Sequence, residues 1–405
     1  MKTTSLLCYC FISSTLAFSD WPQFRGPNAN GHSTATNLPT SWSDTKNVKW
    51  KTPVPEGWSS PILVDDCIYL TAAQTVGGGE KPDLSLRTLC LNAENGNILW
   101  DKEIYSIKGN DLPRIHKKNS HATPTPTIEN SKLYVHFGHQ GTAQLNLDGN
   151  ILWKTNPLDY PPMHGQGCSP IIVGNSLFFS CDGATNPFVI CIDKNNGKEL
   201  WRTKRTTQSK KTFSFCTPTL ITVSGKPQII SPGSGAIFAY EPSSGQELWT
   251  APWGDGYSVI PKPLFAHGLI FASSGFDRPV LMAVKPGGKV VWKIDRQAPH
   301  TPSMLAIGNE LYFVSDRGIM SCVDARTGKE HWQERVCGSI SASPTFGDGK
   351  IYIQDESGKC VIIQPGKVYR TLGENELNER TLASYAVSDG ALFIRGNKHL
   401  FRIGR

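Results

Sequence analysis

Asp193-Lys-Asn-Asn-Gly-Lys-Glu-Leu-Trp201 reads as a tight turn followed by a strand that closes on tryptophan. In this stretch Gly197 supplies the positive-φ position that such a turn requires. The pattern returns along the chain, and its other copies are Asn92–Trp100, Asp148–Trp153, Glu241–Trp249, Lys285–Trp292 and Asp324–Trp332. A turn-and-strand unit that recurs every ~40–50 residues indicates a repeat architecture built from one supersecondary structure.

Each repeat also contains three earlier runs of β-branched and aromatic residues, bounded by Gly, Asp, Asn and Pro, which are typical of strands and turns. The first full repeat begins at Ser59 and ends on Trp100. The same order of runs begins again at Ala122, Cys168, Cys216, Ile260, Thr301 and Ala342. Four strands in each unit of this length predict an all-β fold, a β-propeller of four-stranded antiparallel blades.

The two ends of the chain complement each other. The segment from Ser384 to Ile403 supplies only three strands, and the stretch around Trp50 resembles a closing strand without its beginning. Pairing the two closes a ring of eight blades and covers the sheet edges that a linear array leaves open. The seventh repeat is expected to close on Tyr369 in place of tryptophan. We therefore predict a single eight-bladed domain over residues 47–405, preceded by an irregular arm over residues 20–46.

The N-terminus has the pattern of an export signal. Lys2 precedes a short, mostly apolar core, Ser5–Phe18, and Ala17-Phe18-Ser19 fits the small-x-small cleavage rule. The pattern predicts a signal peptide over residues 1–19, cleaved after Ser19, and a periplasmic or extracellular protein. No later run is long and apolar enough to span a bilayer, so no transmembrane segment is expected in the mature chain.

The cysteines and tryptophans of the repeats favour structural roles. Cys90, Cys191 and Cys322 lie at one position before their turns, and Ala239 and Ala283 occupy it elsewhere. A position that accepts Cys or Ala is a small packing slot, and without a Cys-x-x-Cys motif no metal site is predicted. The tryptophans are expected to pack flat between neighbouring blades as core residues, and they are Trp100, Trp153, Trp201, Trp249, Trp292 and Trp332.

The Gly-x-x-Leu-Trp unit, as in Gly197 to Trp201, resembles the tryptophan-docking repeat of the pyrroloquinoline-quinone-type (PQQ-like) eight-bladed propellers. That superfamily includes quinoprotein alcohol dehydrogenases and the outer-membrane assembly lipoprotein of the β-barrel machinery. The opening Trp21-Pro-Gln-Phe-Arg-Gly-Pro27 is similar to a narrower group, the secreted PQQ-like repeat proteins of planctomycete-type bacteria. The resemblance covers the mature chain and implies the fold. It is compatible with both enzymes and non-catalytic scaffolds.

The face that carries the loops between blades and the second-to-third-strand loops is irregular, and binding residues concentrate on such loops over a rigid scaffold. We expect a ligand site at the mouth of the central channel on this face. The candidate residues are His121, His164, Asp182, Tyr257, Asp277, Arg278 and His300. The alternative is that these polar groups only cap strand ends around a water-filled channel.

Two segments that follow neighbouring blades are basic and could form one patch that attracts acidic partners. Their residues are Lys108, Arg114, Lys117, Lys118, Arg202, Lys204, Arg205, Lys210 and Lys211. An envelope protein or an anionic glycan is the expected partner, and an ordinary solvated surface is the alternative. The formal charge of +7 is modest for this length. No nucleic-acid-binding motif occurs, so nucleic acid is not an expected partner, and a monomer is expected.

The preferred functional prediction is an exported, non-catalytic propeller that binds a protein or a glycan on its irregular face. The alternative is a quinoprotein-type dehydrogenase, or another enzyme that uses the channel mouth. Such a dehydrogenase holds pyrroloquinoline quinone with a calcium ion, which needs several oxygen ligands and an aspartate base. The family's enzymes also use a vicinal disulfide, and no Cys-Cys pair occurs here. No cofactor is therefore expected, and no catalytic residue is assigned.

Overall fold

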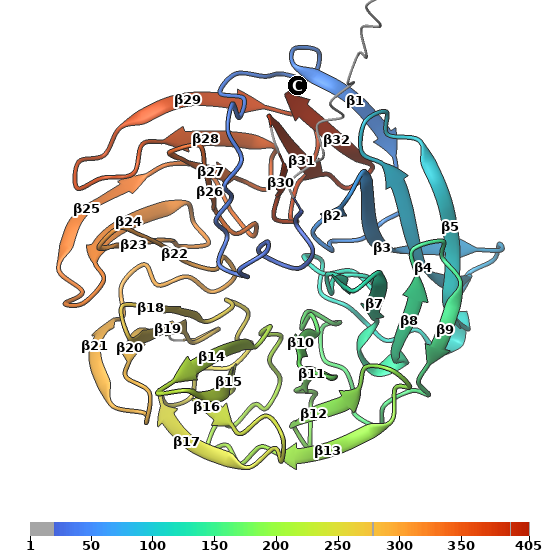
Figure 1. Cartoon of the computed structure of the whole chain (residues 1–405), viewed down its shortest axis with the longest axis horizontal. Helices are drawn as coiled ribbons and strands as arrows, with labels where there is room; N and C mark the ends of the chain where they lie inside the picture. The colour runs from blue at the N-terminus through green and yellow to red at the C-terminus, as the bar shows by residue number, and fades with distance from the viewer. Residues whose placement is uncertain (1–19, 278, 389, 405) are drawn as a thin grey trace, which may run out of the picture.

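The computed structural model describes residues 20–277, 279–388 and 390–404. Thirty-two strands form eight four-stranded antiparallel sheets, which are arranged as the blades of a ring (Figure 1). The all-β, eight-bladed propeller predicted from the repeats is confirmed. No helix in these described ranges is long and apolar enough to cross a membrane.

The blades are numbered along the chain. Blade one contains β2 (Ile62–Val64), β3 (Cys67–Val76), β4 (Asp83–Asn92) and β5 (Ile98–Ile107). Blade two contains β6 (Thr127–Glu129), β7 (Lys132–His136), β8 (Thr142–Asn146) and β9 (Ile151–Lys154). Blade three contains β10 (Ile171–Val173), β11 (Ser176–Cys181), β12 (Phe188–Asp193) and β13 (Glu199–Lys204). Blade four contains β14 (Thr219–Val223), β15 (Lys226–Gly233), β16 (Ala236–Tyr240) and β17 (Glu247–Pro252).

The second half of the ring repeats this order. Blade five contains β18 (Leu264–Ala266), β19 (Leu269–Ser273), β20 (Leu281–Val284) and β21 (Val290–Ile294). Blade six contains β22 (Leu305–Ile307), β23 (Glu310–Val314), β24 (Ile319–Asp324) and β25 (Glu330–Arg335). Blade seven contains β26 (Thr345–Gly347), β27 (Lys350–Gln354), β28 (Lys359–Ile363) and β29 (Thr371–Glu376). Blade eight contains β30 (Ala386–Ser388), β31 (Ala391–Arg395), β32 (His399–Gly404) and β1 (Val48–Pro53). Two short 3-10 turns, η1 (Gly109–Asp111) and η2 (Gly138–Gln140), lie in loops.

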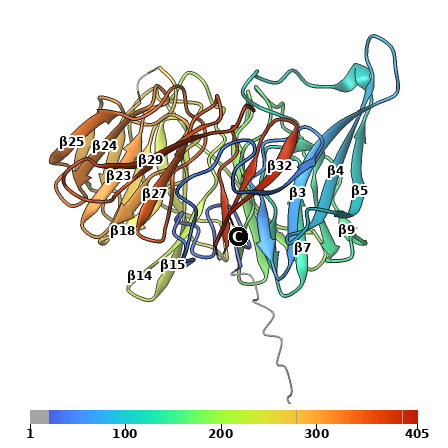
Figure 2. The ribbon, with the colours of Figure 1, turned by 90° about the horizontal axis from the view of Figure 1, so that it is seen from above.

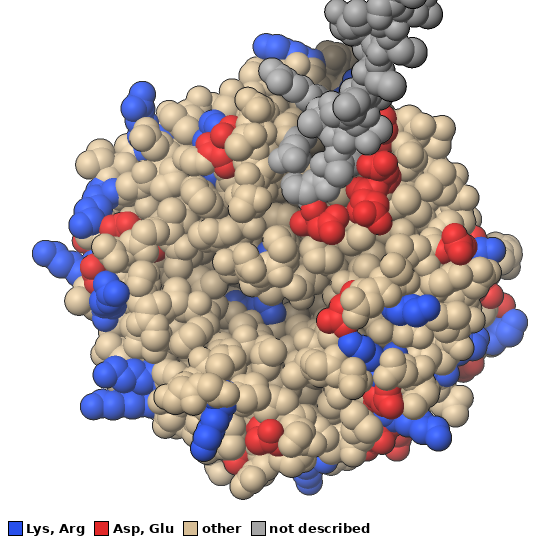
Figure 3. All heavy atoms as spheres, in the orientation of Figure 1, with Lys and Arg blue, Asp and Glu red and all other residues tan. Residues whose placement is uncertain are grey.

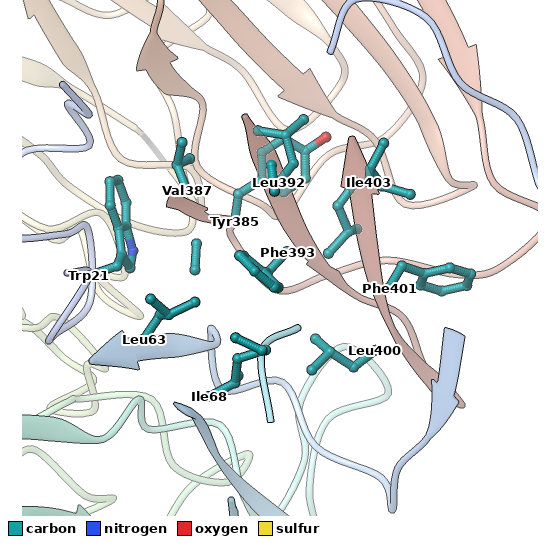
Figure 4. Close-up of a cluster of buried hydrophobic side chains, with 14 of the residues drawn as sticks. Trp21, Leu63, Ile68, Tyr385, Val387, Leu392, Phe393, Leu400, Phe401 and Ile403 are labelled. Atoms are coloured by element: carbon teal, nitrogen blue, oxygen red, sulfur yellow. The ribbon is translucent and has the colours of Figure 1, made fainter. Parts of the chain in front are cut away.

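Blade eight joins the two ends of the chain, as the sequence predicts. Strand β1 pairs antiparallel with β32, and Trp50 lies opposite Arg402 while Lys51 lies opposite Phe401. The largest buried cluster lies at this closure, where side chains of blades one and eight meet those of the arm. Figure 4 shows Trp21 of the arm beside Leu63 and Val387 in this cluster. The ring is therefore sealed by hydrophobic burial as well as by backbone hydrogen bonds.

The repeat tryptophans connect neighbouring blades. The indole Nε1 of Trp153 donates to Lys194 O of the next blade at 3.1 Å, and its ring lies against Gly197 of the same turn. Five further tryptophans bond a carbonyl of the following blade in this way, and they are Trp50, Trp100, Trp201, Trp292 and Trp332. Trp249 is the exception, because its Nε1 donates to Gln228 within its own blade. Most of these rings are only half-buried, so the prediction that they are core residues holds fully for Trp332 alone.

The small-residue slot lies directly across the strand pair from the tryptophan. Cys191 lies opposite Trp201, and Ala239 lies opposite Trp249. Cys90, Cys191 and Cys322 are all buried, and the nine described cysteines are free thiols. A small side chain at this position leaves room for the indole beside it, which is the packing role expected from the sequence.

Blade seven departs from the prediction. Tyr369 lies before the closing strand, which begins only at Thr371, and the position of the repeat tryptophan is occupied by Gly373. The arm takes the place of the missing indole, because Thr40 O lies against Gly373 and Trp42 N donates to the Asn375 side chain at 2.7 Å. Trp42 is buried among residues of blades seven and eight. An aromatic contact between these blades is thus retained, but it comes from a distant segment of the chain.

The arm, residues 20–46, continues across the axis of the ring on the face seen in Figure 1. At one side Trp21 exchanges backbone hydrogen bonds with Leu63, and Pro22 O accepts from Ile128 N. At the other side Arg25 donates to Pro344 O and Met304 O, at 2.5 and 2.8 Å. The arm therefore bridges blades one and two to blades six and seven. On this face the Lys and Arg side chains lie mainly around the circumference (Figure 3).

The opposite face carries the irregular loops. In the view of Figure 2, strands β3, β4 and β5 of blade one rise above the other blades on this side. Strands β3 and β4 remain paired out to Val76 and Asp83. One face of the ring thus carries the arm, and the other carries the long loops.

Candidate functional site

A cavity of about 730 Å³ lies on the axis and opens toward the irregular face. Its walls come from the segments that lead into the innermost strands of the blades, such as His116–Asn119, His300–Ser303 and Leu382–Ser384. Phe24 of the arm also lines it. Because the arm runs over the opposite face, Phe24 lies at the end of the cavity that faces the arm and narrows it there.

A ring of hydroxyl groups surrounds the axis at the depth where the innermost strands begin. Each hydroxyl oxygen accepts a hydrogen bond from the backbone N–H of the equivalent residue in the preceding blade. Six such bonds of 2.9–3.0 Å connect Ser60, Thr125, Ser169, Thr217, Lys262, Ser303, Ser343 and Ser384 in that order, with interruptions after Thr217 and after Ser384. The recurrent Ser/Thr before proline therefore ties neighbouring blades together around the cavity.

Lys262 interrupts this ring, because it occupies the position where the other blades carry serine or threonine. It is only 3% exposed, and its Nζ donates to Pro218 O of the preceding blade. Burial lowers the pKa of Lys262 to about 8. The ammonium group has no carboxylate ion pair among the described residues, so its charge is held by backbone dipoles alone.

One wall of the cavity is a continuous arc of rings. Successive ring centroids are 5.2–6.2 Å apart in edge-to-face or tilted arrangements, which are favourable for aromatic pairs. The rings belong, in order around the axis, to His116, His164, Phe213, Tyr257, Phe276 and His300. Phe276 is 56% exposed, although it is a large apolar side chain at the entrance. The arc offers ring faces and edges to a ligand along half of the wall.

The charged groups at the mouth differ in how far they are already hydrogen-bonded or ion-paired to other protein groups. Both carboxylate oxygens of Asp316 are used, because they accept from His300 N and from the Thr301 backbone and hydroxyl. Glu356 pairs with Lys118 at 2.6 Å and accepts from Ser341. By contrast, Lys211 is exposed and lies 2.7 Å from the Tyr257 hydroxyl and 4.2 Å from the centre of its ring. Arg317 of the cavity wall is also exposed, so two cations are available to a ligand, against the one exposed carboxylate of Asp277 beside Phe276.

The loop that leads into blade two reaches across part of the mouth. Besides the Lys118–Glu356 pair, Lys117 O accepts from the Arg380 guanidinium at 3.3 Å. On the other side the loop contacts the next blade, because His116 N donates to His164 O at 3.0 Å. Desolvation lowers the pKa of His116, and the neighbouring His164 and lysines add to this effect.

Three of the seven residues predicted for the site lie on the cavity wall, namely His164, Tyr257 and His300. Asp277 is exposed next to Phe276 at the entrance, and Arg278 lies outside the described residues. His121 does not line the cavity. Whether the three wall residues bind a ligand stays a prediction.

Asp182 lies away from the cavity, in a buried ion pair with Arg205 at 2.9 Å. It lines a separate void of about 10 Å³. Burial raises the pKa of Asp182 to about 6, while the charge of Arg205 acts in the opposite direction. The expectation that Asp182 faces the channel and that Arg205 belongs to a surface patch is wrong, because each neutralises the other in the interior.

The remaining basic residues do not share one environment. Lys108 pairs with Asp83 at 2.7 Å far out on blade one, and Arg202 pairs with Glu199 on the outer strand β13. Lys118 and Lys211 line the cavity. The remaining residues are exposed and make no salt bridge within 4.0 Å among the described residues, and they are Arg114, Lys117, Lys204 and Lys210. The two basic segments follow blades one and three, so the expectation that they lie after neighbouring blades is wrong, and whether any of their residues attracts an acidic partner stays a prediction.

The sequence did not identify the aromatic residues Phe213 and Phe276, nor Asp316, as parts of the site. Phe213 precedes the innermost strand of blade four as His164 precedes that of blade three, so position in the repeat was a usable signal. Phe276 lies in a loop between the second and third strands, where apolar residues are not expected at the surface. Its exposure is visible only in the folded molecule.

The donor set does not fit a calcium-bound quinone. A Ca²⁺ ion takes six to eight oxygen ligands, and the described residues contain no group of three or more His, Cys, Asp or Glu that could hold a metal ion. Asp316, a carboxylate on the cavity wall, is occupied by backbone and hydroxyl donors. No step through such a cofactor is derived for this chain.

The ring of eight blades, joined by docked tryptophans, has the architecture of a PQQ-like propeller. A family model described as outer membrane protein assembly factor BamB matches residues 85–212 and 277–392, which is more than half of the chain. The chain therefore belongs to this family.

Two proteins with partly similar sequences are a hydrolase and an assembly factor. The tetrathionate hydrolase of Acidithiobacillus ferrooxidans is 21% identical over 73% of this chain and 62% of its own length. The assembly factor BamB of Shewanella oneidensis is 23% identical over 71% of this chain and 67% of its own. The chain thus spans less than two thirds of the hydrolase's length.

A solved structure with the same fold is the quinohemoprotein alcohol dehydrogenase of Comamonas testosteroni. Its TM-score is 0.70 at 10% identity, with 95% of this chain and 80% of that chain covered. At this identity the likeness shows the fold alone. The family thus contains a protein named as an assembly factor, and its fold also occurs in enzymes.

Proposed function

We propose that the protein is an exported, non-catalytic propeller that binds its partner in the axial cavity on the irregular face. The observation that carries the proposal is the cavity itself, with about 730 Å³ of space, Phe24 of the arm at one end and walls of rings and hydroxyls. Pockets for small ligands typically have ~300–1,000 Å³. The partner therefore inserts a slender segment, such as a glycan or a loop of an envelope protein. Export is supported by the N-terminal sequence pattern, which lies outside the described residues.

A cavity-blocking variant tests this proposal. Ile260 lines the cavity, so Ile260→Trp fills it, whereas Ile98→Trp adds the same ring at an exposed site on the outer strand β5. Immobilised wild-type protein and both variants are incubated with an envelope extract, and the retained proteins and glycans are identified by mass spectrometry. We expect wild type and Ile98→Trp to retain a common partner that Ile260→Trp loses, while all three melt cooperatively. Equal retention by all three would place the partner elsewhere and overturn the proposal.

A quinoprotein-type dehydrogenase is the second candidate, and the fold shared with the alcohol dehydrogenase favours it. Purified protein is mixed with pyrroloquinoline quinone and Ca²⁺ and followed by absorbance and by alcohol-dependent dye reduction. Because the cavity does not supply the calcium ligands, we expect no bound quinone band and no turnover. A bound band together with dye reduction would contradict the non-catalytic assignment.

A further inference from the structure

Resting on the proposed function, we infer that the ligand of the axial cavity is an acidic oligosaccharide, bound by its sugar faces to the ring arc and by its acid group to Lys211. The inference comes from three features that coincide in one space. They are an arc of rings that ends on the exposed Phe276, a ring of hydroxyl groups, and two exposed cations, Lys211 and Arg317, against one exposed carboxylate, Asp277.

The ring arc suits a saccharide. A pyranose has a face of C–H groups that packs on an aromatic ring and an edge of hydroxyls that stays hydrogen-bonded. Phe276 presents more than half of its surface at the entrance, and the buried Tyr257 continues the arc inward with its ring centroid 6.0 Å away and Lys211 over its face. Tyr257 combines an apolar ring with a polar hydroxyl. A chain of sugar rings could follow this wall from the mouth toward the axis.

The deeper wall supplies hydrogen-bonding groups instead of apolar ones. The oxygens of Thr125, Ser169 and Ser343 each accept a backbone N–H of the preceding blade, at 2.9–3.0 Å. A hydroxyl is one donor and two acceptors, so each retains its own hydrogen for a ligand. A circle of such groups matches the hydroxyl-rich edge of a sugar better than it matches an apolar peptide side chain.

The positively charged side chains at the mouth of the cavity favour an acidic ligand. The carboxylates of Asp316 and Glu356 are committed to protein donors, as described above. The ammonium group of Lys211 lies over Tyr257 and makes no salt bridge within 4.0 Å among the described residues. Its hydrogen bond to Tyr257 raises the pKa of Lys211, and the exposed Asp277, which attracts it from farther away, contributes to the same shift. Arg317 also lines the cavity and is exposed. A carboxylate or sulfate on a sugar stacked at Phe276 would lie within reach of this positive charge.

The test uses the mature full-length protein and two defined acidic probes, an oligogalacturonide and a sulfated oligosaccharide. The methyl-esterified oligogalacturonide is the matched neutral probe, because it keeps the sugar rings and removes the charge. Calorimetric titration should show binding of at least one acidic probe, weakened by added salt. Binding of the ester should be at least ~10-fold weaker, as expected for the loss of one charge contact. Comparison of the two acidic probes distinguishes a carboxylate from a sulfate ligand.

Single substitutions locate the site. Phe276→Ala and Lys211→Gln should each weaken binding by ~10-fold or more. Lys204→Gln, at an exposed lysine on the outer strand β13, should leave it unchanged. Thermal melting confirms that each variant is folded.

Four outcomes would overturn the inference. If the acidic oligogalacturonide and its methyl ester bind equally well, the charge plays no part in binding. If Lys204→Gln weakens binding as much as Lys211→Gln does, the ligand is not held in the cavity. If no saccharide binds while the Ile260→Trp variant still loses an envelope protein, the ligand is a protein segment and the proposed function stands. If no partner depends on the cavity at all, both the inference and the proposed function fail.

Discussion

Glycine in the repeated turn serves two physical purposes, and only one can be predicted from the turn itself. Gly197 has a φ of +72°, which favours glycine. In addition, a Cβ at this position would lie 2.7 Å from the ring of Trp153 in the preceding blade. The same close approach recurs at Gly96, Gly149, Gly245 and Gly328. The turn glycine is therefore part of the contact between blades.

This double role can be separated by substitution. Gly174 also has a positive φ, of +57°, but no atom lies within 4 Å of its added Cβ. Both Gly197→Ala and Gly174→Ala should pay the backbone cost of ~1–2 kcal/mol. Gly197→Ala should lose at least ~1 kcal/mol more, from the displaced indole. Urea denaturation measures the two free energies of unfolding, and equal losses would refute the steric role.

Lys262 affects the stability of the fold through its buried charge. Its pKa of about 8 lies below the ordinary value of 10.5, so the folded protein binds this proton less tightly than the unfolded chain. The charged form therefore costs stability at neutral pH, and the cost disappears as the pH rises from about 8 to above 10. The difference between the pKa values of Lys262 in the unfolded and folded states corresponds to ~3 kcal/mol of stability at most.

Lys262→Met removes this cost with little change in volume. We expect the variant to be more stable than wild type at pH 7, by up to ~3 kcal/mol less the lost hydrogen bond to Pro218. The advantage should shrink toward zero by pH 10. Denaturation of both proteins across this range measures it, and a difference independent of pH would show that the ammonium group is not destabilising.

At the scale of the elements, blade seven shows how a missing repeat feature is replaced. Its closing strand β29 carries Gly373 where the other blades carry tryptophan, and the arm brings Trp42 to that junction. The sequence around Tyr369 suggested a local substitute, because Tyr is the nearest aromatic residue in the repeat. The substitute is instead more than three hundred residues away in the chain, and no local pattern could identify it.

The arm contact can be tested by truncation of one side chain. Trp42 is 4% exposed, so Trp42→Ala should cost ~3–5 kcal/mol, the usual loss for a buried tryptophan. Thr34→Ala changes an exposed residue of the same arm and should be within ~0.5 kcal/mol of wild type. Thermal unfolding compares the two. A small effect of Trp42→Ala would mean that the arm only covers the propeller.

At the scale of the whole molecule, the repeat period was sufficient to predict the blade number, the strand order and the closure through Trp50. These features depend on local patterns and on the need to cover sheet edges. The site was predicted less well. His164, Tyr257 and His300 reach the cavity because of their place in the repeat, whereas Asp182 is drawn inward by Arg205. The contribution of Phe24 to the cavity wall depends on the path of the arm, which no repeat specifies.

The axial cavity, with Phe24 of the arm at one end, is proposed as the binding site. The most direct test is a crystal structure of the protein with the acidic oligosaccharide that binds best in solution. The account predicts density for sugar rings over Phe276 and Tyr257, with the acid group beside Lys211 and the chain end above Phe24. Sugar bound on the outer strands, with only water in the cavity, would contradict it.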